Sequence, residues 1–385
     1  MSKYLVKLKP IETFFFGGER VLNFYKDELK NNIVKSREFP QQTSILGMIR
    51  KEILVLNGLI KEKWDYSSKE KEQIENLIGK KSFNIRDKNQ DFGIIKKISP
   101  VFIIEEKENK DRVLIKIPKD HKKSKDSRQY TPLKFNNDKG GCLSVKTNLS
   151  EKNIYLPIDF ESKIGLSEDF IDIQTGEIIT QDEIFMKDSS IGIKLDEKHM
   201  TQDECLFRVE KYKFKYDKGS KYFAFILDVN ENFEKLKKFK DYRNVVSLGG
   251  EGSYFLISFK EINFEDKGNG SFNIEEKMTF MNKINLDTKY QKKIILLSDT
   301  FIPKNIYEKY CNYSISKRID FRNLSSDEYH NNKNEDYYKR FKRSTNKYSF
   351  LEKGSVLFSN KREYDELVKT ISNSKFQNIG YNIFL

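Results

Sequence analysis

Three histidines, His121, His199 and His330, are the residues best suited to acid–base chemistry or metal binding near neutral pH. Each stands in a polar stretch, and no second histidine lies near any of them at helical spacing. We therefore favour the interpretation that all three are solvated surface residues. A metal site or an acid–base pair would have to be assembled from residues distant in the sequence, and this alternative stays open.

The stretch LGGEGS, Leu248 to Ser253, is a second candidate for chemistry because it places three glycines between two strand-like runs. Such a turn could cradle a phosphate, close a hairpin or let another backbone pass close by. GGEG does not have the Rossmann spacing, and the earlier FFFGGER lacks the lysine and hydroxyl of a Walker A loop. Nucleoside triphosphate binding is therefore not expected. Glu251 is in principle a general base, and we favour a role in capping its own loop.

The charge of the chain favours a polyanionic partner. Lys and Arg number 71 against 58 acidic residues, which gives the 385 residues a net charge of +13. Nucleic acid and an anionic membrane surface are the leading candidates. The 30 Phe and 20 Tyr suit stacking on unpaired bases, although a Phe-rich core and an AT-biased genome would give a similar composition.

No run approaches the roughly 20 apolar residues of a membrane helix, and the N-terminus has no apolar signal region. Three scattered cysteines without a C-x-x-C pair predict neither a disulfide framework nor a thiolate zinc site. The sequence thus predicts a cytoplasmic protein without membrane attachment, metal or cofactor.

Two N-terminal elements must position the residues that could bind a ligand. Alternating Tyr4, Val6 and Leu8 predict an opening strand that stops at Pro10 and leads into FFFGGER. A helix is predicted next, with Thr43 or Ser44 as its cap. Its apolar stripe consists of Ile45, Ile49, Ile53 and Leu56. Gly47 lies inside this helix, which predicts that something packs closely against it.

Further elements follow along the chain. A polar helix is predicted over residues 67–78 and a long hairpin over residues 93–118. The polar run after it, Asp120 to Arg128, is expected to be a solvated loop of the kind that contacts RNA or partners. KYKFKY, Lys211 to Tyr216, predicts a strand with a lysine face and an aromatic face, and we favour the core as the place of its rings.

The order of these elements predicts an α+β fold. The first part is predicted to run strand, helix, hairpin and strand. The second part is predicted to run strand, helix, glycine turn and further strands. Both orders suit ferredoxin-like units, so we predict two of them in tandem. We place them at residues 1–217, with the inserted hairpin and basic loop, and 218–385, with the glycine-rich loop.

Several segments in order resemble the RAMP proteins of CRISPR effector complexes, in particular the third Cmr subunit of type III-B complexes. The segments span almost the whole chain: an opening strand before FFFGGER, then FPQQTSILGMIRKEIL, a hairpin ending in IPKD, IFMKDSSIGIKLD with MTQDECLFRVEKY, LGGEGSYFLIS, KGSVLF and a terminal GYN. No single segment is specific, and the ordered set carries the resemblance.

The resemblance implies a fold and a role. It implies two ferredoxin-like (RRM-like) domains and a noncatalytic subunit that serves antiviral defence. This subunit holds the 5′ handle of the guide RNA (crRNA) and docks the large polymerase-like subunit onto the backbone RAMP subunit.

The resemblance also suggests residues along the RNA path, and all but one are carried over from its segments. Arg37 is added on charge and position alone. Helix N-termini and glycine turns present backbone amides to phosphate, and arginine adds bidentate contacts. The predicted RNA-binding residues are Gly17, Gly18, Arg20, Arg37, Gln41, Thr43, Ser44, Arg50, Gly249, Gly250, Gly252 and Ser253.

Two departures from the family pattern are present. Asp188, Ser189 and Ser190 stand where the family often has an acid, a spacer and an arginine, and GGEGS lacks the arginine often found beside the glycines. Tyr254 or nearby lysines are the candidate substitutes.

Two other functions stay open. One is a guide-processing RAMP endoribonuclease, which commonly has a histidine early in the chain, whereas the first histidine here is His121. The other is a scaffold subunit that contacts only protein. The sequence does not indicate the role of the Asp120–Arg128 loop or of the Asn323–Asp336 segment.

Overall fold

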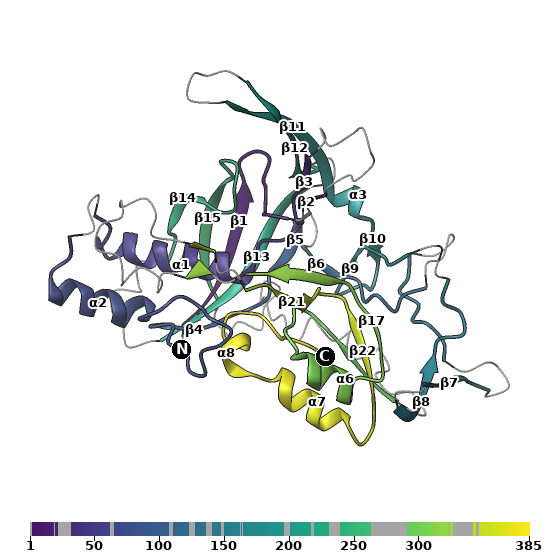
Figure 1. Cartoon of the computed structure of the whole chain (residues 1–385). Coiled ribbons are helices and arrows are strands. Elements are labelled where there is room, and N and C mark those ends of the chain that lie inside the picture. Colours follow the sequence, from purple (N-terminus) through teal and green to yellow (C-terminus); the bar gives the residue numbers. More distant parts are fainter. Residues whose placement is uncertain are drawn as a thin grey trace.

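The computed structural model describes most of the chain and shows a mixed α+β fold with mostly antiparallel sheets (Figure 1). The residues it describes are 2–18, 20–21, 32–61, 65–107, 111–122, 128–135, 141–147, 150–161, 163, 165–195, 201–216, 219–230, 239–262, 291–322, 324–325, 342–343 and 346–385.

A large antiparallel sheet forms the centre of the described structure, with strand order β10-β9-β6-β5-β13-β1-β15-β14 and β4 also paired with β13. Its strands are β1 (Ser2–Pro10), β4 (Ile95–Ile98), β5 (Phe102–Glu106), β6 (Arg112–Lys116), β9 (Phe170–Asp172), β10 (Ile178–Ile179), β13 (Ser220–Val229), β14 (Arg243–Ser247) and β15 (Tyr254–Glu261). β5 and β6 form the hairpin predicted for residues 93–118.

A second sheet, with order β11-β12-β3-β2, carries a long hairpin that projects from the body (Figure 1). Its strands are β2 (Arg20–Val21), β3 (Asn32–Lys35), β11 (Phe185–Leu195) and β12 (Thr201–Phe214). The first four residues of the predicted KYKFKY strand, Lys211 to Phe214, are the end of β12, and Lys215 and Tyr216 follow it. As expected, Phe214 is buried and Tyr212 packs against the core, whereas Tyr216 is exposed.

The C-terminal part consists of short sheets and helices. The sheet strands are β16 (Gln291–Ile295), β17 (Tyr313–Ile315) and β22 (Val356–Asn360), and two strand pairs are β18 (Arg318–Phe321) with β21 (Tyr348–Leu351) and β19 (Leu324–Ser325) with β20 (Lys342–Arg343). The helices are α6 (Lys304–Tyr310), α7 (Tyr364–Ile371) and α8 (Ser374–Gln377). A separate two-stranded sheet, β7 (Leu143–Thr147) with β8 (Ser150–Leu156), comes from the first half of the chain. Among the described residues, no helix is long and apolar enough to cross a membrane.

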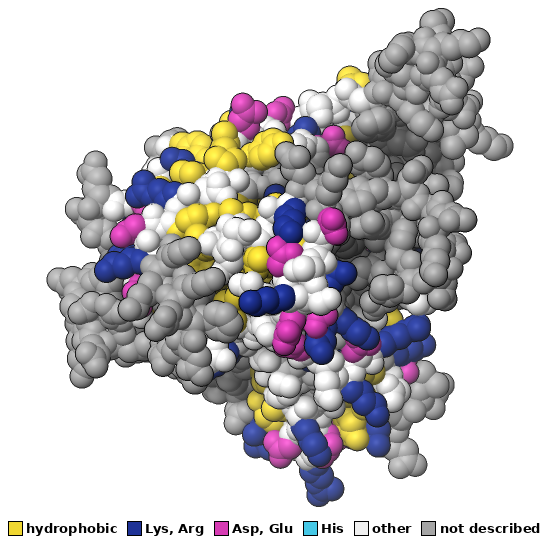
Figure 2. Space-filling model, turned by 90° about the vertical axis from the view of Figure 1, so that its left-hand side faces the viewer, with side chains coloured by type: hydrophobic (Ala, Val, Ile, Leu, Met, Phe, Trp, Pro, Cys, Tyr) yellow, Lys and Arg dark blue, Asp and Glu magenta, His cyan; other side chains and the backbone are white. Residues whose placement is uncertain are grey.

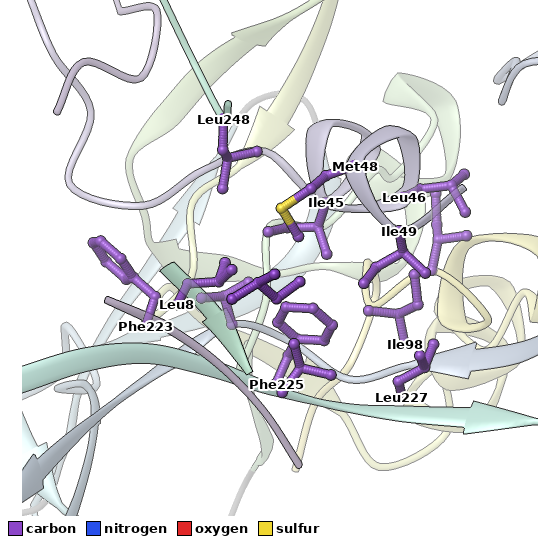
Figure 3. Close-up of a cluster of buried hydrophobic side chains, with 14 of the residues drawn as sticks. Leu8, Ile45, Leu46, Met48, Ile49, Ile98, Phe223, Phe225, Leu227 and Leu248 are labelled. Carbon is purple, nitrogen blue, oxygen red and sulfur yellow. The ribbon is translucent and has the colours of Figure 1, made fainter. Parts of the chain in front are cut away.

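α1 (Gln42–Leu56) covers one face of the large sheet. Ile45, Ile49 and Ile53 of the predicted stripe are fully buried. Ile45 and Ile49 face the strand residues Phe225 and Leu227 (Figure 3). α2 (Ser68–Ile78) packs beside α1 and begins at a capping box in which the Ser67 hydroxyl and the Glu70 carboxylate bond each other's backbone amides. α3 (Gln181–Ile184) is a single turn before β11.

Two details of α1 differ from the prediction. Thr43 and Ser44 do not cap the helix, because it begins at Gln42 and its N-cap residue Gln41 makes no side-chain capping bond. Gly47 is exposed, and a Cβ built there meets nothing within 4 Å. The expected close packing is therefore wrong, and Gly47 only lowers the helix propensity.

The large sheet crosses the predicted domain boundary. β13, which follows residue 217, pairs with β1 on one side and with β5 on the other. The boundary thus does not coincide with a break in the sheet, and the division into 1–217 and 218–385 remains a prediction.

The segment Phe14 to Phe16 joins the two sheets. Phe14 exchanges backbone hydrogen bonds with Tyr212 at 2.7 and 3.0 Å. The Phe15 carbonyl accepts from the Gly250 amide at 2.9 Å, and the Phe16 carbonyl accepts from the Arg37 amide at 2.8 Å. The remaining two amides, of Phe15 and Phe16, donate to the hydroxyls of Ser253 and Ser36 at 2.8 and 2.9 Å.

Replacing Gly249 with Ala tests this close approach. Gly249 has φ +97°, and an added Cβ would lie 2.3 Å from the Phe15 carbonyl oxygen. We expect the free energy of unfolding to fall by more than about 1 kcal/mol. The matched control is Gly47→Ala, which should raise it by about 0.5–1 kcal/mol. Urea unfolding of both variants measures the two effects, and equal stabilities would contradict the packing.

Candidate nucleic-acid interface

A cavity of about 270 Å³ lies at the base of the projecting hairpin, between the second sheet and the C-terminal part. Its walls come from the region of β3, from β6, β11 and β12, and from the strands β18 and β21 with their flanking residues. The lining residues are Gly18, Lys35, Ser36, Arg37, Glu38, Phe39, Lys116, Glu168, Gln181, Lys187, Glu210, Tyr212, Asp299, Lys317, Ile319, Glu352 and Lys353.

Lys116 is the centre of the cavity floor. Its ammonium group contacts the Glu38 carboxylate, lies 3.5 Å from a Glu168 carboxylate oxygen, and sits 4.4 Å from the centre of the Phe170 ring. Burial raises the pKa of Glu38, and the attraction of Lys116 offsets only part of this effect. The buried lysine is therefore held by two carboxylates from different segments.

The ion pairs extend from Lys116 toward the C-terminal part. Lys119, which is 2% exposed, lies 3.0 Å from Glu352 and 3.6 Å from Glu168. Lys317 lies 3.0 Å from Glu168 and 3.5 Å from Glu352. Burial would raise the pKa of Glu168, but Lys119, Lys116 and Lys317 together lower it. The network thus holds the two parts of the wall together.

Lys353 and Asp299 form the deepest part of the floor. The Lys353 ammonium group lies 3.7 Å from the centre of the Phe39 ring, and its backbone amide donates to Asp299 at 3.0 Å. Burial lowers the pKa of Lys353 and raises that of Asp299, so each charge is costly there without the other. Opposite charges thus balance each other across the floor.

The rim differs from the floor because its cations have few partners. Lys35 and Lys187 are exposed and Arg37 is half-buried. Within the part of the chain that the structure describes, no ion pair engages these three side chains, although Arg37 donates to the Asp320 carbonyl at 2.6 Å. The half-buried Glu210, the register partner of Lys35, is an acid in the same lining. The three cations outnumber it, and this arrangement is suited to a phosphate chain.

Of the predicted RNA-binding residues, the structure places Gly18 and Arg37 in the cavity wall. A Cβ on Gly18 would lie 1.8 Å from the Lys35 carbonyl oxygen, so the glycine is required by the close approach of that strand. Gly17 precedes it in the same turn, and the side chain of Arg20 lies outside the described residues.

Gly249, Gly250, Gly252 and Ser253 form the turn of the β14–β15 hairpin. Gly249 and Gly250 pack against Phe15, and Ser253 is 2% exposed, with its hydroxyl also donating to the Gly250 carbonyl at 2.6 Å. Two of the three uses open to the glycines are thus present: a hairpin turn and the close approach of another backbone. Contact with RNA at this turn stays a prediction.

Gln41, Thr43 and Ser44 lie at the start of α1, four to seven residues after Arg37. The Gln41 carbonyl accepts from the amides of Ser44 and Ile45 at 2.9 and 3.1 Å. This helix end faces the C-terminus of the chain, because the neighbouring Gln42 amide group donates to Ser99 and Gly380 carbonyls at 3.2 Å each.

Arg50 lies about 12 Å further along α1, given the rise per helical residue. Its guanidinium donates to the carbonyls of Lys81 and Asp91 at 3.0 and 3.2 Å, and burial lowers its pKa to about 10. The structure therefore separates Arg50 from the cavity and gives it a role in holding the segment after α2.

Sequence reasoning did not identify the cavity lysines. Lys116, Lys317 and Lys353 come from three segments, and nothing in their local sequence distinguishes them from the other lysines of this basic chain. Lys35 could have been found by its position two residues before Arg37. Lys187 lies one residue before the Asp188 to Ser190 departure from the family pattern.

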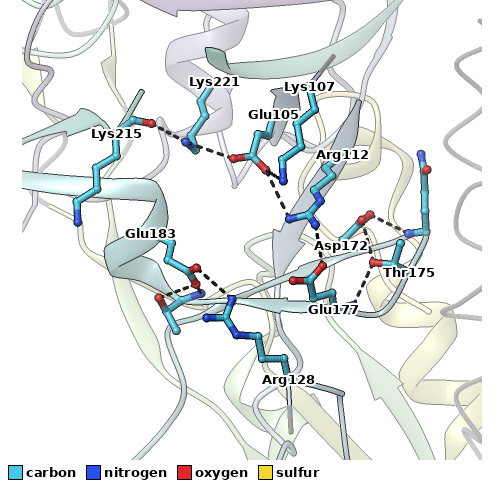
Figure 4. Close-up of polar contacts among 12 residues, drawn as sticks. Glu105, Lys107, Arg112, Arg128, Asp172, Thr175, Glu177, Glu183, Lys215 and Lys221 are labelled. Atoms are coloured by element: carbon cyan, nitrogen blue, oxygen red, sulfur yellow. Dashed lines mark hydrogen bonds and ion pairs between the residues drawn. The ribbon is translucent and has the colours of Figure 1, made fainter. Parts of the chain in front are cut away.

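The two ends of the Asp120–Arg128 loop are tied to the body. Asp120 is 1% exposed and accepts from Lys293 at 2.8 Å, which corrects the expectation of a wholly solvated loop. Arg128 pairs with Glu183 at 3.1 Å (Figure 4). Residues 123–127, and the predicted Asn323–Asp336 segment apart from the backbone of β19, lie outside the described residues.

A second buried charge cluster lies beside this loop. The Glu105 carboxylate lies 3.3 Å from Lys221 and 3.7 Å from Arg112, and Arg112 also pairs with Glu177 at 2.8 Å (Figure 4). These pairs link neighbouring strands of the large sheet and give no open ligand position.

His121 is the one histidine among the described residues. Its ring stacks on Tyr130, and its Nδ1 accepts from the Thr131 amide at 3.1 Å. His199 and His330 lie outside the described residues. The described part of the chain contains no group of three or more His, Cys, Asp or Glu residues that could hold a metal ion.

Comparison with known proteins identifies the family. The family model for CRISPR-associated proteins called Cas_Cmr3 matches residues 6–385 of this chain. The chain belongs to the Cas_Cmr3 family. It is therefore a CRISPR-associated Cmr3 protein, as the ordered segments of its sequence indicated.

The fold of this Cmr3 chain has a distant counterpart among solved structures. A chain in "Cryo-EM structure of the Type III-B Cmr-beta bound to cognate target RNA" aligns with a TM-score of 0.48 and 14% identity. The alignment covers 100% of this chain and 96% of that chain. No curated protein matches the sequence.

The Ser253 hydroxyl of this Cmr3 chain provides the first test of the site. Replacing Ser253 with Ala leaves the buried Phe15 amide without its acceptor, which should lower the free energy of unfolding by about 1–3 kcal/mol. Ser247→Ala, at an exposed position of the same hairpin, should change it by less than about 0.5 kcal/mol. Thermal unfolding measures both, and an unchanged melting temperature for Ser253→Ala would contradict the bond.

Replacing Glu38 with Gln tests the electrostatics of the floor. Because the folded-state pKa of Glu38 is raised above 4.5, its protonated form stabilises the fold at low pH, and this contribution is lost as pH rises through the raised pKa. The Gln variant does not ionise, so its stability relative to the native chain should increase as the pH rises from about 4.5 through the raised pKa of Glu38. Urea midpoints across this range measure the difference, and a decrease with pH would show that ion pairing outweighs burial.

Proposed function

We propose that this Cmr3 chain is a noncatalytic RNA-binding subunit of a type III-B Cmr effector complex. In this role it holds the 5′ handle of the guide RNA at the cationic rim of the cavity, in the cytoplasm. The subunit also docks the large polymerase-like subunit onto the backbone RAMP subunit. The observation that carries the proposal is the set Lys35, Arg37 and Lys187 around a cavity in a chain of this family, three cations that no carboxylate pairs within the described part of the chain.

The distribution of charge supports binding of a phosphate chain over binding of a small anion. The floor already neutralises its lysines with carboxylates, so a small anion entering it would meet Glu38, Glu168 and Asp299. A strand passing over the rim meets three cations and avoids these acids. Its phosphates would release counterions on binding, which makes the affinity dependent on salt.

In this proposal, the glycine turns let the RNA backbone approach the main chain closely. The turn at Gly17 and Gly18 borders the cavity, and the Gly249–Ser253 turn lies on the other side of Phe15 from the Ser36–Arg37 segment. Main-chain amides at such turns can donate hydrogen bonds to a phosphate, which a side chain there would obstruct. The arrangement as two tandem ferredoxin-like units, divided at residue 217, is part of the same proposal.

No observation favours the processing endoribonuclease. Among the described residues the only histidine, His121, is not in the cavity lining but stacks on Tyr130.

The double variant Arg37→Ala/Lys187→Ala tests the proposal in the complex co-purified with its guide RNA. We expect weaker nuclease protection of the guide's 5′ end, and a salt slope of binding that is smaller by about 2 because two phosphate contacts are lost. The matched control is Lys304→Ala/Arg362→Ala, which removes the same charges from exposed C-terminal positions.

The control should protect the guide as the native chain does. Equal protection in Arg37→Ala/Lys187→Ala and in the native complex would refute the assignment of the rim to the guide.

A further inference from the structure

The β14–β15 hairpin exposes apolar side chains on the face of the large sheet that α1 does not cover. Val245 and Leu256 are 54% and 39% exposed and lie directly opposite each other. Tyr254 is 54% exposed on the same face. Ile11, 55% exposed, continues the patch from the end of β1, where its amide donates to the Tyr254 carbonyl at 3.0 Å. We call Ile11, Val245, Tyr254 and Leu256 the outer hairpin face.

Side chains along β14 and β15 alternate between the two faces of the sheet, and apolar residues are unusual on the face toward solvent. Phe255, Ile257 and Phe259 point to the other side and are buried against α1 and its neighbours. The solvent side of such an antiparallel sheet normally carries polar residues. Figure 2 shows hydrophobic side chains gathered on the side of the molecule that carries β14, with Lys and Arg as well as Asp and Glu beside them. A patch of this kind marks an interaction surface.

The position of β14 adds a second feature. β14 is the last strand of the large sheet in the described structure, and β15 is its one neighbour there. An outermost strand presents backbone N–H and C=O groups that can pair with a strand from another chain. Apolar side chains beside such an edge favour binding of an extended peptide segment as an additional strand. Main-chain hydrogen bonds to the edge provide the affinity, and contacts of every second side chain of the segment provide the specificity.

The charge around the outer hairpin face defines the partner further. Lys9 lies opposite Leu256, and Arg243 and Lys260 occupy outward positions on β14 and β15. The outward positions of β14 and β15 carry no acidic side chain: they are Arg243, Val245, Ser247, Tyr254, Leu256, Ser258 and Lys260. A partner with acidic side chains flanking an apolar centre would therefore complement this face.

Protein fits this surface better than RNA. Bases stack on aromatic rings, and only Tyr254 in the outer hairpin face offers one. Val245, Leu256 and Ile11 have no ring to stack on, and their burial is favoured by contact with other apolar side chains.

We propose that the outer hairpin face binds an apolar extended segment, flanked by Asp or Glu, of another protein subunit of the Cmr complex. The segment adds to the edge of β14 as a further strand. This inference rests on the proposed function in that it assumes membership of the complex, and it assigns the partner to a surface distinct from the cavity rim.

The double variant Val245→Glu/Leu256→Glu tests the docking in a complex co-expressed with the other Cmr subunits and guide RNA. Both side chains are exposed, and the added carboxylates oppose an acidic partner. We expect at least one protein subunit to co-purify about tenfold less or to be lost. The matched control is Leu143→Glu/Val145→Glu, which makes the same changes on the exposed strand β7 and should keep every subunit.

Amide hydrogen exchange of the native chain is a second test, and it does not depend on whether the double variant folds. Amides of residues 243–247 should exchange at least about tenfold more slowly in the complex than in the isolated full-length chain. Unchanged exchange, or full subunit stoichiometry in Val245→Glu/Leu256→Glu, would overturn the docking surface. A dimer of the isolated chain that this variant dissociates would overturn it in favour of a second copy.

The outcomes separate this inference from the proposed function. Loss of guide protection in Val245→Glu/Leu256→Glu with all protein subunits retained would assign the face to RNA and overturn the inference. Retained subunits and retained guide protection would overturn the docking alone. A native chain that joins no Cmr complex would contradict both.

Discussion

The backbone of Phe14, Phe15 and Phe16 is hydrogen-bonded at all six of its polar groups to segments that are far apart in the sequence. These partners are the base of the projecting hairpin, the β14–β15 turn and the Ser36–Arg37 segment. The three rings are buried in the core, so the segment cannot shift without exposing apolar surface. The position of the cavity rim relative to the large sheet depends on this short stretch.

The charged residues of the cavity form two groups, which differ in their contact with water and in their need for a partner of opposite charge. Its floor lies where two parts of the chain meet, and burial there requires each lysine to have a carboxylate partner. Its rim comes from strand ends and turns that remain in contact with water, where cations such as Lys35 and Lys187 need no partner. The ion pairs of the floor join separate segments of the chain, while the rim keeps the charge that can attract a nucleic acid.

Local patterns in the sequence predicted local structure. The stripe Ile45, Ile49 and Ile53 predicted α1, and the hairpin at residues 93–118 follows from two β-rich runs around a turn. The same patterns could not predict that β13 inserts between β1 and β5, because strand order is set by contacts between distant residues. The Gly47 prediction failed for a related reason: helix propensity reports the cost of a glycine but not its surroundings.

The candidate site was predictable only in part. Gly18, predicted from the family resemblance, and Arg37, predicted from charge and position alone, both line the cavity. Arg50 was grouped with them through the family resemblance, yet its guanidinium donates to the Lys81 and Asp91 carbonyls. Lys116 and Lys353 carry no local signal, because a buried lysine is recognised only by the carboxylates that folding brings to it. The predicted RNA contacts themselves remain predictions.

Ultraviolet crosslinking of the purified complex, followed by mass spectrometry of the crosslinked peptides, tests the central claim most directly. If the cavity rim holds the guide, its 5′ nucleotides will crosslink to peptides of this chain that contain Lys35 to Arg37 or Lys187. Crosslinks of those nucleotides confined to other subunits, with the rim peptides unmodified, would contradict the account.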